Sequence, residues 1–154
     1  MTDIPAPYRL LFLYIEPIAA LGGTVLCLFR PLQFLQTFSP LATAATFDPL
    51  SQPIYDQLAA LLLLFAWTQA VVLRSTSDIT VWKRILFGMA LCDGIHLWGQ
   101  YRILGPEVFF DPRLWRSEEW LNFIMLYGPG GMRLAFCAGI GLVAGKEGKG
   151  GKTE

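Results

Sequence analysis

The sequence predicts an all-α integral membrane protein, a bundle of four transmembrane helices. Of its 154 residues, 54% are hydrophobic and 16% are charged, and the mean hydropathy is +0.47, whereas a soluble domain carries about 25% charged residues. Four apolar stretches, at about 10–29, 54–73, 81–101 and 119–144, each approach the roughly 20 residues that a helix needs to cross a hydrocarbon core. They lack the alternation of barrel strands, and lipid admits only helices or closed barrels. A helix bundle is therefore expected.

Helix-breaking segments separate these stretches. Residues 30–53 are rich in Pro, Thr and Ser, residues 74–80 are short and polar, and residues 102–119 mix charge with proline and aromatic side chains. Ser77 or Asp78 is expected to cap the third helix.

The fourth helix is expected to start near Ser117, because two glutamates follow in its first turn. Pro17 can kink the first helix, and the segment GPGG at 128–131 either frees backbone groups toward a cavity or allows tight packing of small residues. The four helices form one domain, 1–145, and the glycine- and lysine-rich residues 146–154 are expected to be a disordered polar tail.

Basic residues outside the predicted spans are divided unequally between the two sides of the membrane. Seven lie on the side of the two termini and the short second loop, and four lie on the other side. The seven are Arg9, Arg74, Lys83, Arg84, Lys146, Lys149 and Lys152, and the four are Arg30, Arg102, Arg113 and Arg116. The positive-inside rule then places both termini in the cytosol, and the endoplasmic reticulum is the expected membrane.

Several function classes are excluded. Twelve basic and twelve acidic residues cancel, so no charge asymmetry attracts nucleic acid. The three cysteines lie in apolar runs without C-x-x-C spacing, and one histidine with carboxylates on different helices does not match metal-ligand spacing. The ending GGKTE lacks the first glycine of a phosphate-binding loop. We therefore expect no metal and no cofactor.

Polar side chains inside the spans require an explanation, because an ionisable group at mid-membrane is unfavourable by about 2.5–3.5 kcal/mol on insertion scales. With 1.5 Å of rise per residue, Glu16 lies about 9 Å from the cytosolic end of its helix, and Arg133 and Gln69 lie near that depth. Asp93 is deeper, at about 15 Å, and His96 shares its helix face. The full set of candidate residues is Glu16, Gln69, Asp93, His96, Gln100, Asn122, Tyr127 and Arg133.

Two interpretations of this set stay open. Glu16 and Arg133 could form only a structural ion pair between the first and fourth helices, and Gln69, Gln100 and Asn122 could serve interhelical hydrogen bonding. Alternatively, a cavity that holds two carboxyls contains one that stays ionised and one that donates a proton. We expect Glu16, paired with Arg133, to be the ionised one and Asp93 to be the acid, although the roles could be exchanged.

Such a pair suits acid-triggered opening of an epoxide, or protonation of an alkene or carbonyl, followed by attack of water or an internal hydroxyl. The catalytic residues would be Glu16, Asp93, His96 and Arg133, with His96 orienting Asp93 or relaying its proton. Gln69, Gln100, Asn122 and Tyr127 would bind the substrate, with Tyr127 or Asn122 positioning an oxygen. A lipophilic substrate would enter from the bilayer.

Four segments carry a family resemblance: FLYIEPIAALGG, LRSTSDITVWKRILFGMALCDGIHLWG, GPEVFFDP and GPGGMRLAF. Together they resemble a family of small, four-span fungal membrane proteins, several of which are encoded beside polyketide or terpenoid pathways, and the resemblance extends to about Gly145. It implies an epoxide hydrolase or cyclase that builds oxygen heterocycles, as in pathways to polyene pyrones of the aurovertin and citreoviridin type. Glu16, Asp93, His96 and Arg133 lie within the matching segments.

Three functions therefore compete. The first is epoxide hydrolysis or cyclisation on a polyepoxide. The second is sterol-isomerase-like or terpene-cyclase-like carbocation chemistry on a lipid. The third is a non-enzymatic lipid-binding or scaffold protein, in which the polar residues only specify helix pairing. The expected partners are a lipophilic small molecule and membrane lipid, and the chain could also form a homo-oligomer.

Overall fold

The computed structural model describes residues 4–142, which form helices and no strand. The predicted disordered tail, 146–154, lies outside the described residues. In chain order the elements are α1 (Ala6–Leu10), a π-helical turn (Leu11–Ile15), α2 (Glu16–Phe29), α3 (Pro31–Gln36), a 3₁₀ turn (Pro49–Ser51), α4 (Gln52–Trp67), a second π-helical turn (Thr68–Val72), a 3₁₀ turn (Leu73–Ser75), α5 (Ile79–Phe110), a 3₁₀ turn (Pro112–Leu114) and α6 (Ser117–Cys137). The all-α prediction is confirmed.

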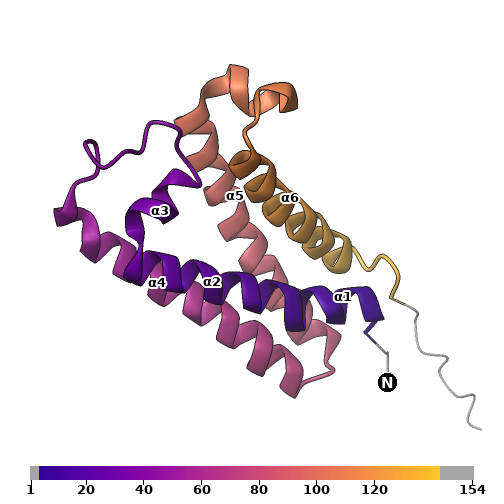
Figure 1. Ribbon diagram of the computed structural model, residues 1–154. Helices are drawn as coiled ribbons and strands as arrows, with labels where there is room; N and C mark the ends of the chain where they lie inside the picture. The colour runs from indigo at the N-terminus through magenta and orange to yellow at the C-terminus, as the bar shows by residue number, and fades with distance from the viewer. Residues whose placement is uncertain (1–3, 143–154) are drawn as a thin grey trace, which may run out of the picture.

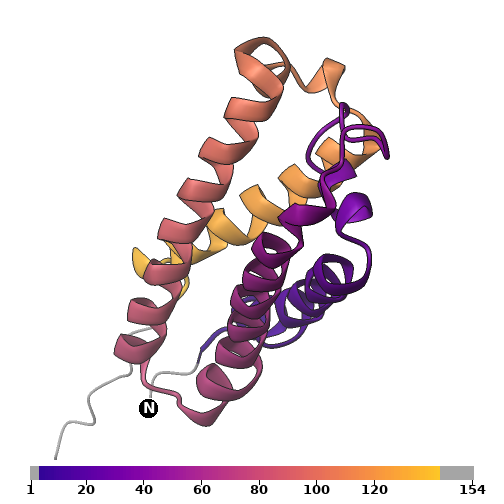
Figure 2. The same ribbon diagram turned by 90° about the vertical axis from the view of Figure 1, so that its left-hand side faces the viewer.

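The helices pair as two hairpins. Helix α2 packs along α4, and α5 packs against α6, so that each hairpin is made of neighbours in the sequence. The α5–α6 hairpin crosses the α2–α4 hairpin, as the two views in Figures 1 and 2 show. Tyr8 donates a hydrogen bond from its hydroxyl to the Ile140 carbonyl (2.9 Å), which places both ends of the described chain at one end of the molecule (Figure 2).

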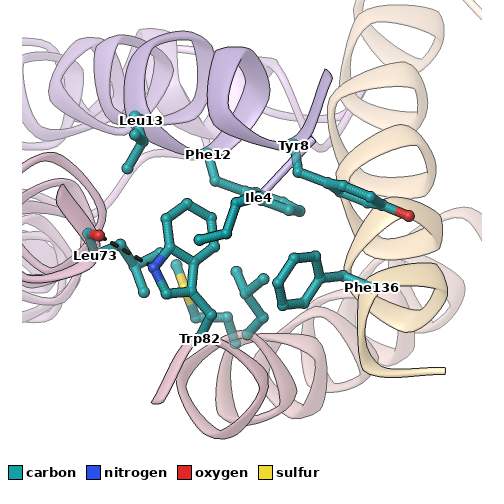
Figure 3. Close-up of a cluster of buried hydrophobic side chains, with 9 residues drawn as sticks. Ile4, Tyr8, Phe12, Leu13, Leu73, Trp82 and Phe136 are labelled. Carbon is teal, nitrogen blue, oxygen red and sulfur yellow. Dashed lines mark hydrogen bonds between the residues drawn. The ribbon is translucent and has the colours of Figure 1, made fainter. Parts of the chain in front are cut away.

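A hydrophobic core joins the hairpins at that same end (Figure 3). Four of its side chains are each at most 1% exposed: Phe12 from the first π-helical turn, Leu73 from the 3₁₀ turn Leu73–Ser75, Trp82 from α5 and Phe136 from α6. The Tyr8 and Phe136 rings meet edge to face with centroids 5.0 Å apart, a favoured aromatic geometry. The core therefore fixes the point at which the two hairpins cross.

Trp82 also has a polar role in this core. Its indole Nε1–H is shared between the carbonyls of Leu73 (3.1 Å) and Thr76 (2.9 Å), at the end of the preceding helix, and Figure 3 shows the indole pointing toward Leu73. The indole thus supplies a donor to carbonyls that a helix C-terminus leaves without intrahelical partners.

Trp82→Phe should lower the free energy of unfolding by about 1–3 kcal/mol, because it leaves the buried Leu73 carbonyl and the partly buried Thr76 carbonyl without this donor. Unfolding in mixed detergent micelles would measure the loss. The matched control is Trp98→Phe, since Trp98 is 60% exposed and should give a change near zero. Equal stability of the two variants would contradict this role of Trp82.

Helix starts and ends follow local rules. Asp78 caps α5 by accepting hydrogen bonds from the backbone N–H groups of Thr80 (2.7 Å) and Val81 (3.4 Å), as one of the two predicted alternatives. Helix α6 begins at Ser117 as expected, where Glu119 accepts a hydrogen bond from the Arg116 backbone N–H (2.8 Å) in a capping box.

Three boundaries differ from the prediction. Helix α5 continues to Phe110 instead of ending near 101, with a kink at Gly105, whose φ is +73°. Helix α6 ends at Cys137 and not at 144, because Gly139 takes φ +85° and the Ile140 N–H turns back to the Ala135 carbonyl (2.9 Å), as in a Schellman motif. Helix α3 lies inside the predicted loop 30–53.

Two helices of the described chain are long and apolar enough to cross a membrane: Ala6–Phe29 with 24 residues and Pro49–Ser75 with 27 residues. Both carry large exposed hydrophobic side chains, such as Ile18 (69% exposed) and Leu64 (57% exposed). Exposed apolar side chains on helices of this length are typical of contact with lipid or another apolar partner.

Candidate functional site

Arg133 of α6 connects the two hairpins through a buried ionic cluster. Its Nη2 lies 2.6 Å from Glu16 Oε2 of α2, and its Nη1 is bonded to Asp93 Oδ2 of α5. Gln69 completes the set by donating its Nε2–H to the same Glu16 oxygen. We call Glu16, Gln69, Asp93 and Arg133 the polar cluster. The Arg133 and Glu16 side chains are only 6% and 7% exposed, and that of Asp93 is 16% exposed.

Local backbone features bring these groups together. Pro17 has no N–H, and the turn before it, Leu11–Ile15, is π-helical; Gln69 lies in the second π-helical turn, Thr68–Val72. Single π turns insert an extra residue and redirect side chains, frequently at functional sites. Gly130 packs against Asp93, because a Cβ there would lie 3.4 Å from Asp93 Oδ2. The predicted role of the GPGG segment in close helix approach is thus visible at Gly130.

The charges of the polar cluster do not balance when all its members are ionised. Two carboxylates face one guanidinium, and Glu16 Oε1 and Arg133 Nε are buried without a hydrogen-bond partner in the described chain. One added proton would bring the net charge of the cluster to zero. Since buried charge is unfavourable without full compensation, the cluster is suited to hold a single transferable proton.

An apolar cavity of about 450 Å³ lies beside the polar cluster, between α3, α4 and α5. Its polar lining comes from one face of α5, where Asp93, His96 and Gln100 follow the i, i+3, i+7 spacing of a helix. The other walls are aromatic and aliphatic, including Phe34 and Phe38. A volume of this size suits a small lipophilic ligand.

The cavity presents three different polar groups. Asp93 reaches it from the edge of the polar cluster, and His96 lies one turn further along α5, with its ring centroid 5.3 Å from that of Phe38. Gln100 is only 2% exposed, and its Nε2 has no hydrogen-bond partner within the described residues. A buried amide without a partner is unfavourable by about 1–3 kcal/mol, so Gln100 is a candidate for binding a ligand oxygen.

The other predicted site residues take different positions. Glu16, Gln69 and Arg133 lie behind Asp93 and are not part of the cavity lining. Asn122 donates its side-chain N–H to the Thr37 carbonyl, which ties α6 to the segment after α3. Tyr127 lines a second cavity of about 320 Å³ between α5 and α6, which Asp93 also reaches.

Sequence reasoning missed the aromatic wall of the larger cavity. Phe34 lies in α3 and Phe38 lies in the turn that follows α3. Both belong to a segment that was predicted to be a loop. A signal was present, since Pro31 stands at the first helical position, which proline favours, and Phe34 and Phe38 are spaced one turn apart. Arg116 fixes this segment by donating to the Gln36 carbonyl (3.5 Å).

Comparison with known proteins gives a family and no assigned activity. The model of the domain of unknown function DUF7704 matches residues 1–142, which is most of the 154-residue chain. No curated protein and no solved structure matches the chain. The match covers both helical hairpins, the polar cluster and the two cavities that Asp93 reaches. This chain therefore belongs to the DUF7704 family.

Proposed function

We propose that the protein crosses the membrane four times, with both termini in the cytosol, in the endoplasmic reticulum. The part of α5 before the kink at Gly105 covers residues 79–104 and is about 39 Å long, and α6, with 21 residues, is about 32 Å long, so both exceed a hydrocarbon core of about 30 Å. Exposed Leu91 and Leu121 give these two helices apolar outer faces. Arg9, Arg74 and Lys83 lie at the end that holds both ends of the described chain, which favours a cytosolic position for that end.

We further propose that the protein is a membrane-embedded enzyme that opens an epoxide in a lipophilic, polyketide-type substrate. The observation that carries this proposal is Asp93, a carboxyl that reaches an apolar cavity while Arg133 holds it from behind. His96 lies beside it on the same helix face. A carboxyl and an imidazole in one apolar cavity supply an acid and a base.

The proposed reaction begins with proton transfer from Asp93 to the epoxide oxygen as one carbon–oxygen bond of the ring breaks. Water, or a hydroxyl of the substrate, forms the new carbon–oxygen bond and releases its proton to His96. Transfer of that proton from His96 to Asp93 restores the starting state. Attack by water adds one water molecule to the substrate, whereas attack by an internal hydroxyl isomerises it to an oxygen heterocycle.

Glu16, Arg133 and Gln69 position Asp93 in this mechanism. Arg133 binds both carboxyls, so Glu16 holds the guanidinium while Asp93 exchanges its proton. Gln69 fixes Glu16 through the hydrogen bond to Oε2. In this mechanism Glu16 is ionised, as expected from the sequence, but Glu16 acts through Arg133 and not on the substrate.

The proposal is tested by giving the purified, reconstituted protein a polyepoxide in heavy-oxygen water and analysing the products by mass spectrometry. Label incorporation without ring formation indicates hydrolysis, and ring formation without label indicates cyclisation. An unchanged polyepoxide would contradict both outcomes. A sterol-like alkene, assayed in parallel, tests the second candidate function.

That second candidate, carbocation chemistry, is favoured by the aromatic walls of the cavity. Phe34, Phe38, Tyr55 and Phe65 all line it, and aromatic faces stabilise cations. Protonation of an alkene by Asp93 would then replace protonation of an epoxide. The scaffold hypothesis accounts for the ion pairs of the polar cluster, but it gives no role to an apolar cavity that His96 and the unpartnered Gln100 amide line.

Gln100→Leu should raise KM for an oxygen-bearing substrate by about tenfold and leave kcat within about twofold, because a neutral hydrogen bond contributes about 0.5–1.5 kcal/mol to binding. Gln100 lies about 10 Å from Asp93 along α5 and so contacts a part of the substrate away from the reacting bond. Steady-state kinetics on the reconstituted protein measures both constants. The control, Gln33→Leu, changes a glutamine outside this cavity. An equal fall in kcat would instead place Gln100 at the reacting group.

A further inference from the structure

A third cavity, of about 370 Å³, opens at the end of the molecule where the described chain begins and ends. Two arginines line it, Arg9 from α1 and Arg74 from the end of the helix Pro49–Ser75, together with the polar segment Ser75–Ser77. Trp82 closes it toward the hydrophobic core. Unlike the cavity beside Asp93, this one is rich in positive charge and hydrogen-bond donors.

Arg74 is held in place before any ligand binds. Pro17 cannot donate the hydrogen bond that the Leu13 carbonyl would receive in a regular helix, and Arg74 Nη2 donates to that carbonyl instead (3.0 Å). The guanidinium carbon also lies 4.7 Å from the centroid of the Tyr14 ring. These contacts use one of the five guanidinium N–H donors, so a fixed, positively charged group with free donors borders the cavity.

No carboxylate of residues 4–142 forms an ion pair with Arg9 or Arg74. The carboxylate that follows Arg74 most closely in the sequence is Asp78. It accepts hydrogen bonds from the backbone N–H groups of Thr80 and Val81 and caps α5. Both arginines are exposed. The two positive charges of the cavity are thus not paired with any carboxylate of the described residues.

The position of the two arginines indicates where their counter-charge comes from. Each stands in the terminal turn of a helix that is long and apolar enough to cross a membrane, Ala6–Phe29 for Arg9 and Pro49–Ser75 for Arg74. In the proposed topology, on which this inference rests, such a position corresponds to the level of the lipid headgroups, and basic pockets between helices on the cytosolic side bind anionic headgroups. We propose that this cavity binds the phosphate group of an anionic phospholipid, with Arg9 and Arg74 as its charged contacts and the Ser77 hydroxyl as a further donor.

The site is independent of Asp93 and of catalysis, so it can be tested without a substrate. The protein is reconstituted in phosphatidylcholine nanodiscs with and without phosphatidic acid, released gently, and analysed by native mass spectrometry for retained lipid. Wild-type protein should retain phosphatidic acid in preference to phosphatidylcholine. Arg9→Gln and Arg74→Gln should each lower that preference by about fivefold, the effect of one basic residue near a membrane surface.

Two further variants separate the site from general attraction and from misfolding. Arg84→Gln removes one positive charge from an exposed residue at the same end that does not line the cavity, and it should leave the preference unchanged. Arg74→Lys keeps the charge and should retain most of the preference, with unfolding in micelles confirming that each variant is folded.

Three results would overturn the proposal. An equal effect of Arg84→Gln would indicate only general electrostatic attraction. Equal retention of phosphatidylcholine would show that the cavity does not select for charge. Displacement of the lipid by glycerol phosphate at equal concentration would identify a soluble phosphate as the ligand instead.

Discussion

Asp93→Asn should lower turnover of a polyepoxide by about 10²–10⁴-fold, the usual contribution of a positioned acid or base. Asparagine has nearly the same shape and its oxygen can still accept a hydrogen bond from Arg133, but its amide cannot donate and recover a proton in a catalytic cycle. The substitution also removes one negative charge from a cluster of two carboxylates and one guanidinium. The bundle should therefore remain folded, which thermal unfolding and circular dichroism would verify beside the kinetic assay.

Glu16→Gln is the matched control for this variant. It removes the same charge from the same cluster, but Glu16 does not line the cavity. Its effect should be smaller than that of Asp93→Asn, because it acts only through Arg133. Comparable losses in the two variants would indicate that both carboxyls take part directly, and full activity of Asp93→Asn would remove Asp93 from the mechanism.

Arg133→Met should destabilise the bundle by about 3–5 kcal/mol, the effect of removing one partner from a buried ion pair. Methionine roughly keeps the apolar length of the side chain, so the loss comes mainly from electrostatics. Both Glu16 and Asp93 would be left without a counter-charge, on helices of two different hairpins. Unfolding in mixed micelles, followed by circular dichroism, measures the change.

Removing the stranded charges should recover most of this loss. In the triple variant Arg133→Met, Glu16→Gln and Asp93→Asn, no member of the polar cluster is charged. Its stability should approach that of wild type, since neutral replacements of buried ion pairs are often tolerated. A triple variant as unstable as Arg133→Met would instead assign the loss to packing of the arginine side chain, for instance against Phe12, whose ring centroid lies 6.0 Å from the guanidinium carbon.

Much of the fold could be predicted because hydrophobic length and helix caps are local signals. Each of the four apolar stretches contains a helix of the structure, and Asp78 and Ser117 mark the predicted starts of α5 and α6. The end of α6 was predicted wrongly because residues 138–144 are as apolar as the helix before them. The helix ends there because Gly139 takes φ +85°, a backbone conformation that hydropathy does not report.

The polar cluster was predicted in part. Counting residues along straight helices placed Glu16, Gln69 and Arg133 at one depth, and the structure joins them. The same count placed Asp93 deeper, away from Arg133, but the two bind each other. Asp93 and Arg133 lie on the paired helices α5 and α6, and the difference of about 6 Å between their expected depths is within the length of an arginine side chain.

Helix periodicity predicts that Tyr127 and Arg133 face different sides of α6, so that Tyr127 lies away from the polar cluster. Tyr127 and Arg133 are six residues apart, which places their side chains about 120° from each other around α6. Arg133 faces the polar cluster, whereas Tyr127 lines the smaller cavity between α5 and α6. The contact of Asn122 with Thr37 depends on how the long segment after α3 folds back, and no sequence period encodes that arrangement.

The place of Arg133 in the chain has a consequence for biogenesis. In the proposed topology α6 is the last helix to be synthesised. Arg133 lies about one turn from its end at Cys137, and a buried arginine there opposes insertion by up to about 2.5–3.5 kcal/mol, the value for a helix centre. Its partners Glu16, Gln69 and Asp93 all lie on earlier helices, so they are already in the bilayer when α6 leaves the ribosome. Stable entry of α6 then depends on correct placement of the first three helices. In that topology, a chain whose first three helices are misplaced would leave Arg133 without its partners and α6 outside the bilayer, where quality control can recognise it.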